Sequence, residues 1–438
     1  MRILLVNKFH YLNGGSEKYY FELGKLLKKH GNEVAYFSMK DGRNIKTGEK
    51  EYFVEKIDLN TGSKLKALDV IYSKENYKKM QEAIDDFKPD VVHLNNFQRQ
   101  LSESIVECCR DNNIPMVFTA HDVQAICPAI SMLDSGKNIC EKCIKGKYIN
   151  CFKKKCVKNS TLKSLLGAYE GNYYRRKKVY TKKIKNIITP SIFYKNKLIE
   201  DGIQEDKIKA IHNFINIEEY NLKLEDEGYA LYSGRLAKEK GILNLVEAFS
   251  NLIINNKNND KLKNIKLYIA GNGPEKENIE KTIKENKLED KIILLGYLNQ
   301  KDLKEYTRKC GFLVIPSIWY ENGPYSVIET QSIGKAIIGA NIGGIPEMVI
   351  NNENGLTYKY NDVKELEEKM KNLFSDVELR EKFGKNAKKF AIKEYSPENY
   401  YEKIEKIYRN VEDALNEKVW FYQWIKNACL YWNYINAC

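Results

Sequence analysis

The chain alternates short apolar runs with longer stretches whose apolar residues recur at helical spacing, and few folds accommodate this alternation. In the first half, the apolar runs that predict strands are Ile3–Val6, Val34–Phe37, Val91–Leu94, Met116–Ala120 and Asn186–Thr189. After the first run, a Gly14-Gly15 turn leads into a helix that Ser16 is expected to cap and Gly31 to end. Short strands separated by helices predict a parallel, doubly wound sheet with helices on both faces.

The second half repeats this alternation from about residue 229. Its predicted strands are Tyr229–Tyr232, Ile265–Ala270, Ile292–Leu294, Phe312–Ile315 and Ala336–Gly339. With 438 residues the chain exceeds one ordinary core. We therefore expect an α/β protein with two Rossmann-like domains facing across a cleft, residues 1–215 and 216–396, with a hinge near 211–228. Residues 397–438 are expected to form a helical segment.

Charge is concentrated in one stretch of the first domain. Residues 137–185 contain sixteen Lys or Arg and only two acids, so the rest of the chain is nearly neutral. Such a stretch favours an anionic partner, although a solvated surface explains it equally well. No recognition-helix or RNP-type pattern is present, so we expect no nucleic acid and favour an anionic membrane surface.

The chain lacks the roughly 18-residue apolar run of a membrane-spanning helix, and its first residues resemble a strand rather than a signal peptide. We therefore expect a cytoplasmic protein, with peripheral attachment to the inner face of the cell membrane as an extension of that prediction. The C-terminal stretch supports the extension because it contains three of the four Trp. One broad helical face there gathers Trp420, Phe421, Trp424, Ile425, Ala428, Tyr431, Trp432 and Ile435. The alternative is that this face packs on the first domain.

Four cysteines lie within a basic insertion predicted at residues 127–185. They form the pairs Cys140-x2-Cys143 and Cys151-x4-Cys156, a spacing that can hold a structural zinc ion. Because their separation is short for a zinc module, a disulfide pair or free thiols are alternatives. Cys127, beside a proline, is expected in the core.

Polar residues with useful chemistry follow several predicted strands. Glu321 and Glu329 follow the strand ending at Ile315, with seven residues between them, and Arg235 and Lys240 follow the strand ending at Tyr232. His121 ends the strand Met116–Ala120. The carboxyl ends of parallel strands meet at one edge of a sheet, where ligands of such folds bind. Two cations beside a glycine turn suit a diphosphate, and a histidine can donate a hydrogen bond to a sugar hydroxyl or polarise a leaving oxygen.

Taken together, the segments Gly-Gly-Ser-Glu, His-Asp, SGRLAKEKG, Gly-Asn-Gly-Pro and WYENGPYSVIE resemble the retaining glycosyltransferases of family four, from Met1 to about Tyr395. The resemblance implies a GT-B fold and a hexosyltransferase that uses a UDP- or GDP-type sugar donor and retains the anomeric configuration. In that fold the last helix returns to the first domain, which the resemblance implies for residues 397–438. A glycan or lipid-linked acceptor, in the synthesis of a surface polysaccharide or glycolipid, would be implied with it.

The resemblance also implies roles for individual residues. Arg235 and Lys240 would hold the diphosphate, Glu329 the ribose hydroxyls, and Glu321 the donor sugar, with His121 near the reacting face. Amides of the turn Gly14-Gly15 would face the other side of the diphosphate.

The chain departs from the family's pattern after Glu321. Many members have an aromatic residue and then glycine where this chain has Gly323 and Pro324. Proline has no N–H, so donor contacts are expected from Gly323, Tyr325 or Ser326. Because no Asp-x-Asp occurs, we expect no metal or other cofactor to be required for catalysis.

Two other functions fit the same architecture. A nucleotide-sugar epimerase would change the sugar without an acceptor, and a non-catalytic protein would only bind the nucleotide sugar. The intact set of Arg235, Lys240, Glu321 and Glu329 disfavours the latter. An NAD-dependent Rossmann enzyme is disfavoured because no GxGxxG follows the first strand.

Overall fold

The computed structural model describes residues 1–57, 68–411 and 413, and it contains two separate parallel sheets, as the sequence predicted. The first sheet has seven strands in the order β3-β2-β1-β4-β5-β6-β7. Its strands are β1 (Arg2–Val6), β2 (Glu33–Met39), β3 (Lys50–Val54), β4 (Val91–Leu94), β5 (Met116–Thr119), β6 (Asn186–Thr189) and β7 (Ile208–Ala210).

The second sheet has six strands in the order β10-β9-β8-β11-β12-β13. They are β8 (Ala230–Ser233), β9 (Leu267–Ala270), β10 (Ile292–Gly296), β11 (Phe312–Ile315), β12 (Ala336–Ala340) and β13 (Gly355–Tyr358). Every strand pair is parallel, which requires a crossover after each strand.

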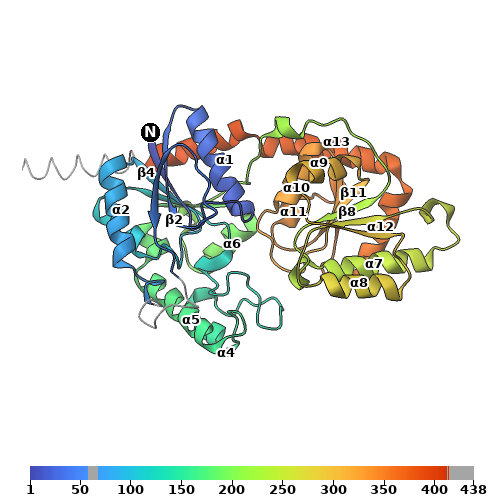
Figure 1. Ribbon diagram of the computed structural model, residues 1–438, viewed down its shortest axis with the longest axis horizontal. Coiled ribbons are helices and arrows are strands. Elements are labelled where there is room, and N and C mark those ends of the chain that lie inside the picture. The colour runs from blue at the N-terminus through green and yellow to red at the C-terminus, as the bar shows by residue number, and fades with distance from the viewer. Residues whose placement is uncertain (58–67, 412, 414–438) are drawn as a thin grey trace, which may run out of the picture.

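Helices supply those crossovers and cover the sheets (Figure 1). In the first half they are α1 (Gly15–Lys29), α2 (Lys74–Phe87), α3 (Ser104–Asp111), α4 (Ile149–Lys153), α5 (Thr161–Arg176) and α6 (Ile192–Glu200). In the second half they are α7 (Ile242–Asn255), α8 (Lys276–Glu285), α9 (Gln300–Lys309), α10 (Tyr325–Ile333), α11 (Ile345–Met348), α12 (Val363–Ser375) and α13 (Val377–Glu394). Two short helical turns of the first half are used below, η2 (Val123–Ala125) and η4 (Val179–Lys183, a π-helical turn).

The first sheet is buried on both faces, which explains its nearly continuous apolar strands. Along β1, Leu4 and Val6 belong to one hydrophobic core while Ile3 and Leu5 belong to another on the opposite face. The second sheet is enclosed by a single large core that includes residues of β8, β11 and β12. Each half of the chain therefore buries its own sheet.

Residues 397–411 are helical and leave the second half to pack on the first (Figure 1). Tyr400, Ile404 and Tyr408 are buried in the core that also contains Ile3 and Leu5. The Tyr400 hydroxyl lies 2.5 Å from that of Tyr19 in α1. The aromatic stretch expected to bind a membrane, residues 419–438, lies outside the described residues.

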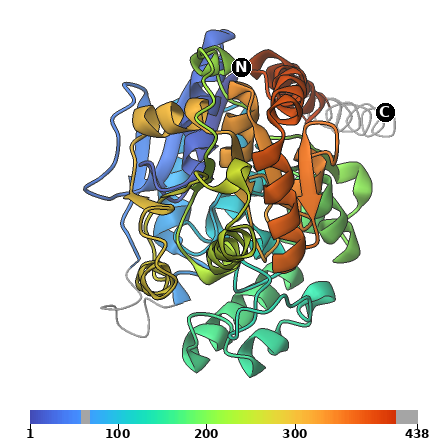
Figure 2. The ribbon, with the colours of Figure 1, turned by 90° about the vertical axis from the view of Figure 1, so that its right-hand side faces the viewer.

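The basic insertion forms a small helical lobe that carries α4 and α5 and projects from the first half (Figure 1 and Figure 2). Within the described residues, no helix has the length and apolarity needed to cross a membrane.

One detail of the first crossover differs from expectation. Gly14, not Ser16, is the N-cap of α1, and no side chain caps the helix there. The Ser16 hydroxyl lies one position into the helix and donates to the Glu17 carboxylate at 2.9 Å. The first turn of α1 therefore lacks a side-chain cap for its amides.

Candidate functional site

Lys240 and Glu321 form a buried ion pair at the carboxyl edge of the second sheet. Their strands, β8 and β11, are direct neighbours, which brings together residues 81 positions apart. The Lys240 Nζ lies 2.7 Å from Glu321 Oε1, and the same oxygen accepts hydrogen bonds from Ser317 Oγ at 2.7 Å and Trp319 Nε1 at 2.9 Å. The lysine also lies over the Trp319 ring, 5.1 Å from its centroid.

This surrounding keeps Glu321 ionised although only 6% of the residue is exposed. Burial acts to raise the pKa of the carboxyl, but the Lys240 charge and the hydrogen bonds from Ser317 and Trp319 outweigh it. The net result is a pKa below the ordinary value of glutamate. A fixed negative charge therefore stands beside a fixed positive one in the cleft.

Arg235 lies on the same loop as Lys240 but faces solvent. Its guanidinium contacts the Glu239 carboxylate, whose other oxygen lies 3.6 Å from Lys137 Nζ. Because Lys137 comes from the insertion of the first half, this contact bridges the two halves. With 57% of its side chain exposed, Arg235 is accessible to a ligand.

Glu329 turns away from Glu321 and contacts a different set of groups. Its carboxylate lies 2.5 Å from Lys18 Nζ in α1 and accepts a hydrogen bond from the Tyr220 hydroxyl at 3.2 Å. Lys18 also lies 5.3 Å from the centroid of the Tyr325 ring. The two glutamates of the motif therefore do not share one cluster, and Glu329 joins the second half to α1 instead.

His121 stands at the end of β5 with its ring largely fixed. Its Nε2 lies 2.9 Å from Asn95 Oδ1, and its ring packs edge-on against Tyr19 with centroids 4.7 Å apart. The Asn95 amide group donates to the Val6 carbonyl, so its oxygen faces the histidine and accepts a hydrogen bond from Nε2–H. Burial lowers the pKa of His121 to about 3. The imidazole is therefore neutral near pH 7, with Nδ1 left as a hydrogen-bond acceptor.

His93, which also ends a strand, has a structural environment. Its two ring nitrogens contact the hydroxyls of Tyr408 at 2.5 Å and Thr119 at 2.8 Å. It therefore links β4 to the returning helix rather than to the cleft.

A cavity of about 240 Å³ lies between the two halves and is lined by half of the predicted catalytic and donor-binding residues, but not by Arg235, Lys240 or Glu329. Gly15, His121, Glu321, Gly323 and Tyr325 all line it. Gly14 lines a neighbouring cavity with Lys18, and Ser326 lies in the first turn of α10 without lining either.

Close packing explains two glycines near Glu321 and Tyr325, which line this cavity. A Cβ on Gly15 would lie 2.8 Å from the Tyr325 ring, so the start of α1 approaches the start of α10 only because residue 15 has no side chain. Gly343 has φ +60°, and a Cβ there would meet the Glu321 carbonyl oxygen at 2.6 Å. Both positions bring backbone against the cleft in a way that a larger residue would prevent.

Asn322, between Glu321 and Gly323, was not singled out in the sequence. Its amide group donates to the carbonyls of Ala120 and His121 at 3.0 and 3.1 Å, and its oxygen accepts from Ser191 Oγ at 2.7 Å. It thus ties the loop after β11 to the strand end that carries His121.

Glu347 makes a second connection that the sequence did not predict. Its carboxylate accepts from the backbone amides of Ile192 and Phe193 at 2.7 and 2.6 Å, at the N-terminus of α6 in the first half. A carboxylate placed there satisfies amides that lack helical partners and stabilises the helix dipole. The closed arrangement of the halves is therefore held by directed hydrogen bonds.

The cysteines of the insertion are present as free thiols. Cys143 and Cys151 are buried in a small core with Tyr148 and Ala168, against which Cys156 packs. In the part of the chain that the structure describes, no group of three or more His, Cys, Asp or Glu is placed to hold a metal ion. The zinc site at Cys140, Cys143, Cys151 and Cys156 therefore stays a prediction.

Two family models match successive parts of the chain. The model described as "Glycosyltransferase Family 4" matches residues 13–219, and the model described as "Glycosyl transferases group 1" matches residues 213–390. The first covers the sheet that carries His121, and the second covers the sheet that carries Lys240 and Glu321.

Curated relatives match over part of their length. An uncharacterized glycosyltransferase of Methanocaldococcus jannaschii is 30% identical over 249 residues, which cover 57% of this chain and 66% of that protein. A capsular polysaccharide biosynthesis glycosyltransferase of Staphylococcus aureus, CapM, is 27% identical over 232 residues, covering 51% of this chain and 58% of that one. The chain thus spans between about half and two thirds of these relatives.

Solved structures share the whole fold at low identity. A glycosyltransferase from Rickettsia africae superposes with a TM-score of 0.69 at 21% identity, covering 94% of this chain and 98% of that chain. Anabaena HepE in complex with UDP superposes with a TM-score of 0.67 at 15% identity, covering 94% and 100%. The GT-B arrangement expected from the sequence is confirmed.

Proposed function

Because the chain belongs to the group 1 glycosyltransferases of family 4, we propose that it is a retaining hexosyltransferase. Its donor would be a nucleotide diphosphate-sugar of the UDP or GDP type, and its acceptor a glycan or a lipid-linked saccharide. The product would belong to a cell-surface polysaccharide or glycolipid, as the name of the Staphylococcus aureus relative indicates for that protein.

The observation that carries the proposal is the ion pair of Lys240 with Glu321, because Glu321 lines a cavity that His121 lines from the first half. The pair joins two neighbouring strand ends of the second half, where ligands of open α/β sheets bind. A lysine held this way presents a fixed cation without further ordering. A bound diphosphate would compete with Glu321 for it.

The other donor contacts that we propose involve residues near this pair. Arg235, on the same loop and exposed, would bind the diphosphate together with Lys240. The amides of Gly323 and Tyr325 line or adjoin the cavity and would contact the donor sugar, and Ser326 would add its hydroxyl.

Glu329 and the turn Gly14-Gly15 would complete the donor site from the side of α1. In the closed structure Glu329 pairs with Lys18, so ribose binding would replace or share that contact. The uncapped first turn of α1 offers amides of the kind that bind phosphate.

The proposed chemistry follows from the negative charge that develops on the leaving nucleotide diphosphate. Cleavage of the sugar–phosphate bond leaves a nucleotide diphosphate, and each preorganised donor to such a charge contributes roughly 3–4 kcal/mol to catalysis. On the other wall, neutral His121 would accept a hydrogen bond from a sugar hydroxyl through Nδ1. This differs from the donor role considered for it in the sequence.

Other parts of the chain would support the enzyme without contacting the reacting atoms. The cysteine pairs would bind a structural zinc ion remote from the transfer step. The basic insertion and the C-terminal aromatic stretch would attach the enzyme to the inner face of the cell membrane, where a lipid-linked acceptor is presented.

Binding and turnover together test the proposal. We expect a panel of nucleotide diphosphates and nucleotide sugars to raise the melting temperature selectively, because ligands that bind only the folded state stabilise it. Lys240→Ala should abolish the shift, whereas Lys238→Ala, an exposed lysine two residues earlier, should preserve it. No shift with any member of the panel would count against the donor class.

The alternatives give different products in the same assay. An epimerase would convert the nucleotide sugar without acceptor, and a non-catalytic binder would show the thermal shift with no conversion at all. Acceptor-dependent release of nucleotide diphosphate is expected only from the transferase.

A further inference from the structure

A large cavity that has no role in the proposed reaction lies within the first half. It occupies about 710 Å³ between α5, η4 and the loop that follows α6. This volume falls within the range of small-molecule sites, about 300–1,000 Å³. Tyr148, Tyr174 and Tyr180 contribute aromatic surface to its walls.

Two buried polar groups of residues that line this cavity have no hydrogen-bond partner among the residues that the structure describes. The Gln98 side-chain amide donates to the Tyr180 hydroxyl at 3.0 Å, which leaves its oxygen unpaired, and the Tyr174 hydroxyl is also unpaired. Both residues are more than nine-tenths buried. A buried acceptor without a partner raises the free energy of the folded protein. A ligand that supplies hydrogen-bond donors would therefore bind favourably at the Gln98 oxygen.

A buried carboxyl adds to the polar character of the interior. Glu170 lines the cavity and is 5% exposed, with Arg99 Nε at 3.3 Å from one oxygen. Burial nevertheless raises the pKa of Glu170 above its ordinary value. An occupant with several hydroxyl groups could bond to Gln98, Tyr174 and Glu170 together, whereas an apolar occupant would leave the Gln98 oxygen and the Tyr174 hydroxyl unsatisfied.

The rim of the cavity is cationic. Lys178 and Lys182 are exposed, and the described part of the chain provides neither side chain with a hydrogen bond or an ion pair. Arg175 is also at the rim, where it pairs with Asp201 at 2.9 Å. Two uncompensated ammonium groups at the entrance favour an occupant with a negatively charged substituent.

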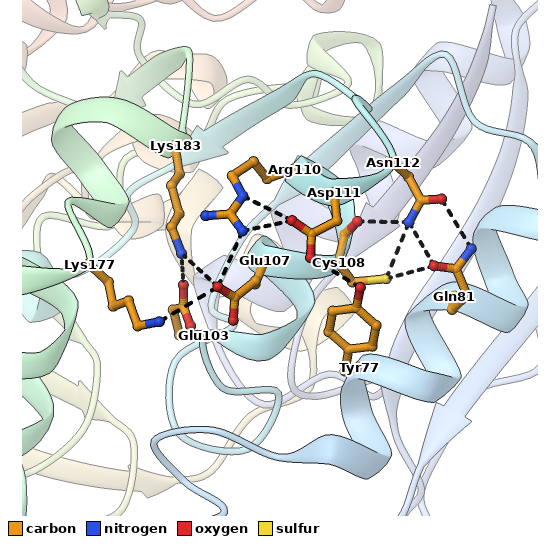
Figure 3. Close-up of polar contacts among 10 residues, drawn as sticks. All are labelled: Tyr77, Gln81, Glu103, Glu107, Cys108, Arg110, Asp111, Asn112, Lys177 and Lys183. Carbon is orange, nitrogen blue, oxygen red and sulfur yellow. Dashed lines mark hydrogen bonds and ion pairs between the residues drawn. The ribbon is translucent and has the colours of Figure 1, made fainter.

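The turn η4, which contains Tyr180 and Lys182, is joined to α3 by ion pairs of Lys183 (Figure 3). Lys183, in the same π-helical turn, reaches the buried carboxylate of Glu103 at the start of α3 and lies 3.8 Å from Glu107. Lys177 contacts Glu107 as well, at 3.6 Å. The cavity is therefore preformed, as small-molecule sites usually are.

We propose that this cavity is a second binding site, which takes an anionic saccharide. Tyrosine faces and hydrogen-bonding groups would hold the sugar ring, and Lys178 with Lys182 would hold a carboxylate or phosphate on it. The cavity adjoins the cleft through η2, since Asp122 and Val123 line the cleft cavity while Gln124 and Ala125 line this one. The site would thus hold the distal part of an acidic acceptor chain, a role that rests on the proposed transferase function.

Calorimetry with the full-length protein tests the binding step alone. The probes are a glucuronate-containing tetrasaccharide, a phosphorylated tetrasaccharide, a neutral glucose tetrasaccharide and inorganic phosphate. We expect an acidic tetrasaccharide to bind at least about tenfold more tightly than the neutral one, and the two acidic probes distinguish carboxylate from phosphate. Equal affinity of neutral and acidic probes, binding of inorganic phosphate alone, or binding of no probe would overturn the proposal.

Variants locate the binding. Lys178→Ala/Lys182→Ala should weaken the acidic probe by about tenfold, whereas Lys142→Ala/Lys153→Ala, two exposed lysines of the same stretch outside the cavity, should not. Gln98→Leu should weaken acidic and neutral probes alike. Unchanged affinity in the lysine pair variant refutes the placement even if the Gln98 variant fails to fold.

The thermal shift with nucleotide sugars separates this inference from the transferase proposal. Donor binding should be unaffected by the lysine substitutions, since neither residue lines the cleft cavity. A protein that binds the donor but no acidic saccharide keeps the function and loses the second site. A protein that binds the acidic saccharide but no donor would support the second site and contradict the transferase function.

Discussion

Replacement of Lys240 by alanine should destabilise the second half in a way that depends on pH. The substitution leaves Glu321 with its hydrogen bonds from Ser317 and Trp319 but without a counter-charge. Removal of one partner from a buried pair costs about 3–5 kcal/mol. We expect about 3 kcal/mol, the lower end, because 24% of the Lys240 side chain is exposed and two hydrogen bonds to the carboxylate remain.

The sign of the pH dependence follows from the pKa of Glu321. In the native protein this pKa lies below its ordinary value, so the stabilisation is complete above the unfolded-state pKa and is lost as the pH falls through the folded one. Without Lys240, the effect of burial dominates and should raise the pKa of Glu321 above the ordinary value of glutamate. The folded variant would then bind a proton more readily than the unfolded chain, and the destabilisation should shrink as the pH falls from about 8 to about 5.

Thermal unfolding followed by circular dichroism measures the effect. For a unit of 150–250 residues each kcal/mol corresponds to roughly 2–4 °C, so we expect a loss of about 6–12 °C near neutral pH. Lys238→Ala should change little because that side chain is exposed. In a Glu321→Gln background, Lys240→Ala should lower the melting temperature much less. A loss that is equally large at low pH, or undiminished in that background, would refute the reasoning.

Other outcomes follow from the same geometry. Arg235→Ala and Glu329→Ala should each lower turnover by about a hundredfold or more with circular dichroism unchanged, and wild-type rates in both would contradict the donor assignment. NMR of the product's anomeric proton should show the retained configuration, and turnover should persist in EDTA. Elemental analysis should find zinc in proportion to protein if the four cysteines of the insertion bind it, and its absence would refute that prediction. Sedimentation with anionic liposomes, but not with neutral ones, is expected for membrane attachment and should be abolished by high salt.

The buried strands could be predicted from sequence because their signal is local. Strands such as β4 and β11 are continuous apolar runs between polar turns. Three strands were missed for equally local reasons. β3, with the sequence KEYFV, is a largely polar edge strand, β7 has only three residues, and β13 begins with a glycine. Edge positions need less apolar surface, so hydrophobic patterning says little about them.

The candidate site divides in the same way. Residues that follow strand ends, such as His121 and Lys240, could be identified because topology alone brings strand ends to one edge. Their partners could not be identified, because the contacts join residues far apart in the chain. Lys18 and Glu329 are 311 positions apart, and Glu347 meets the amide of Ile192 across 155 positions. Such contacts depend on how the two halves close.

The helix at residues 397–411 makes the chain order differ from the spatial order of the domains. Its tyrosines complete the core around β1, so the second sheet is in effect an insertion within the first domain. A chimera designed to exchange donor preference would consequently need two junctions, one near residue 215 and one near residue 396. During synthesis, likewise, the first domain cannot finish its core until the ribosome has passed residue 411.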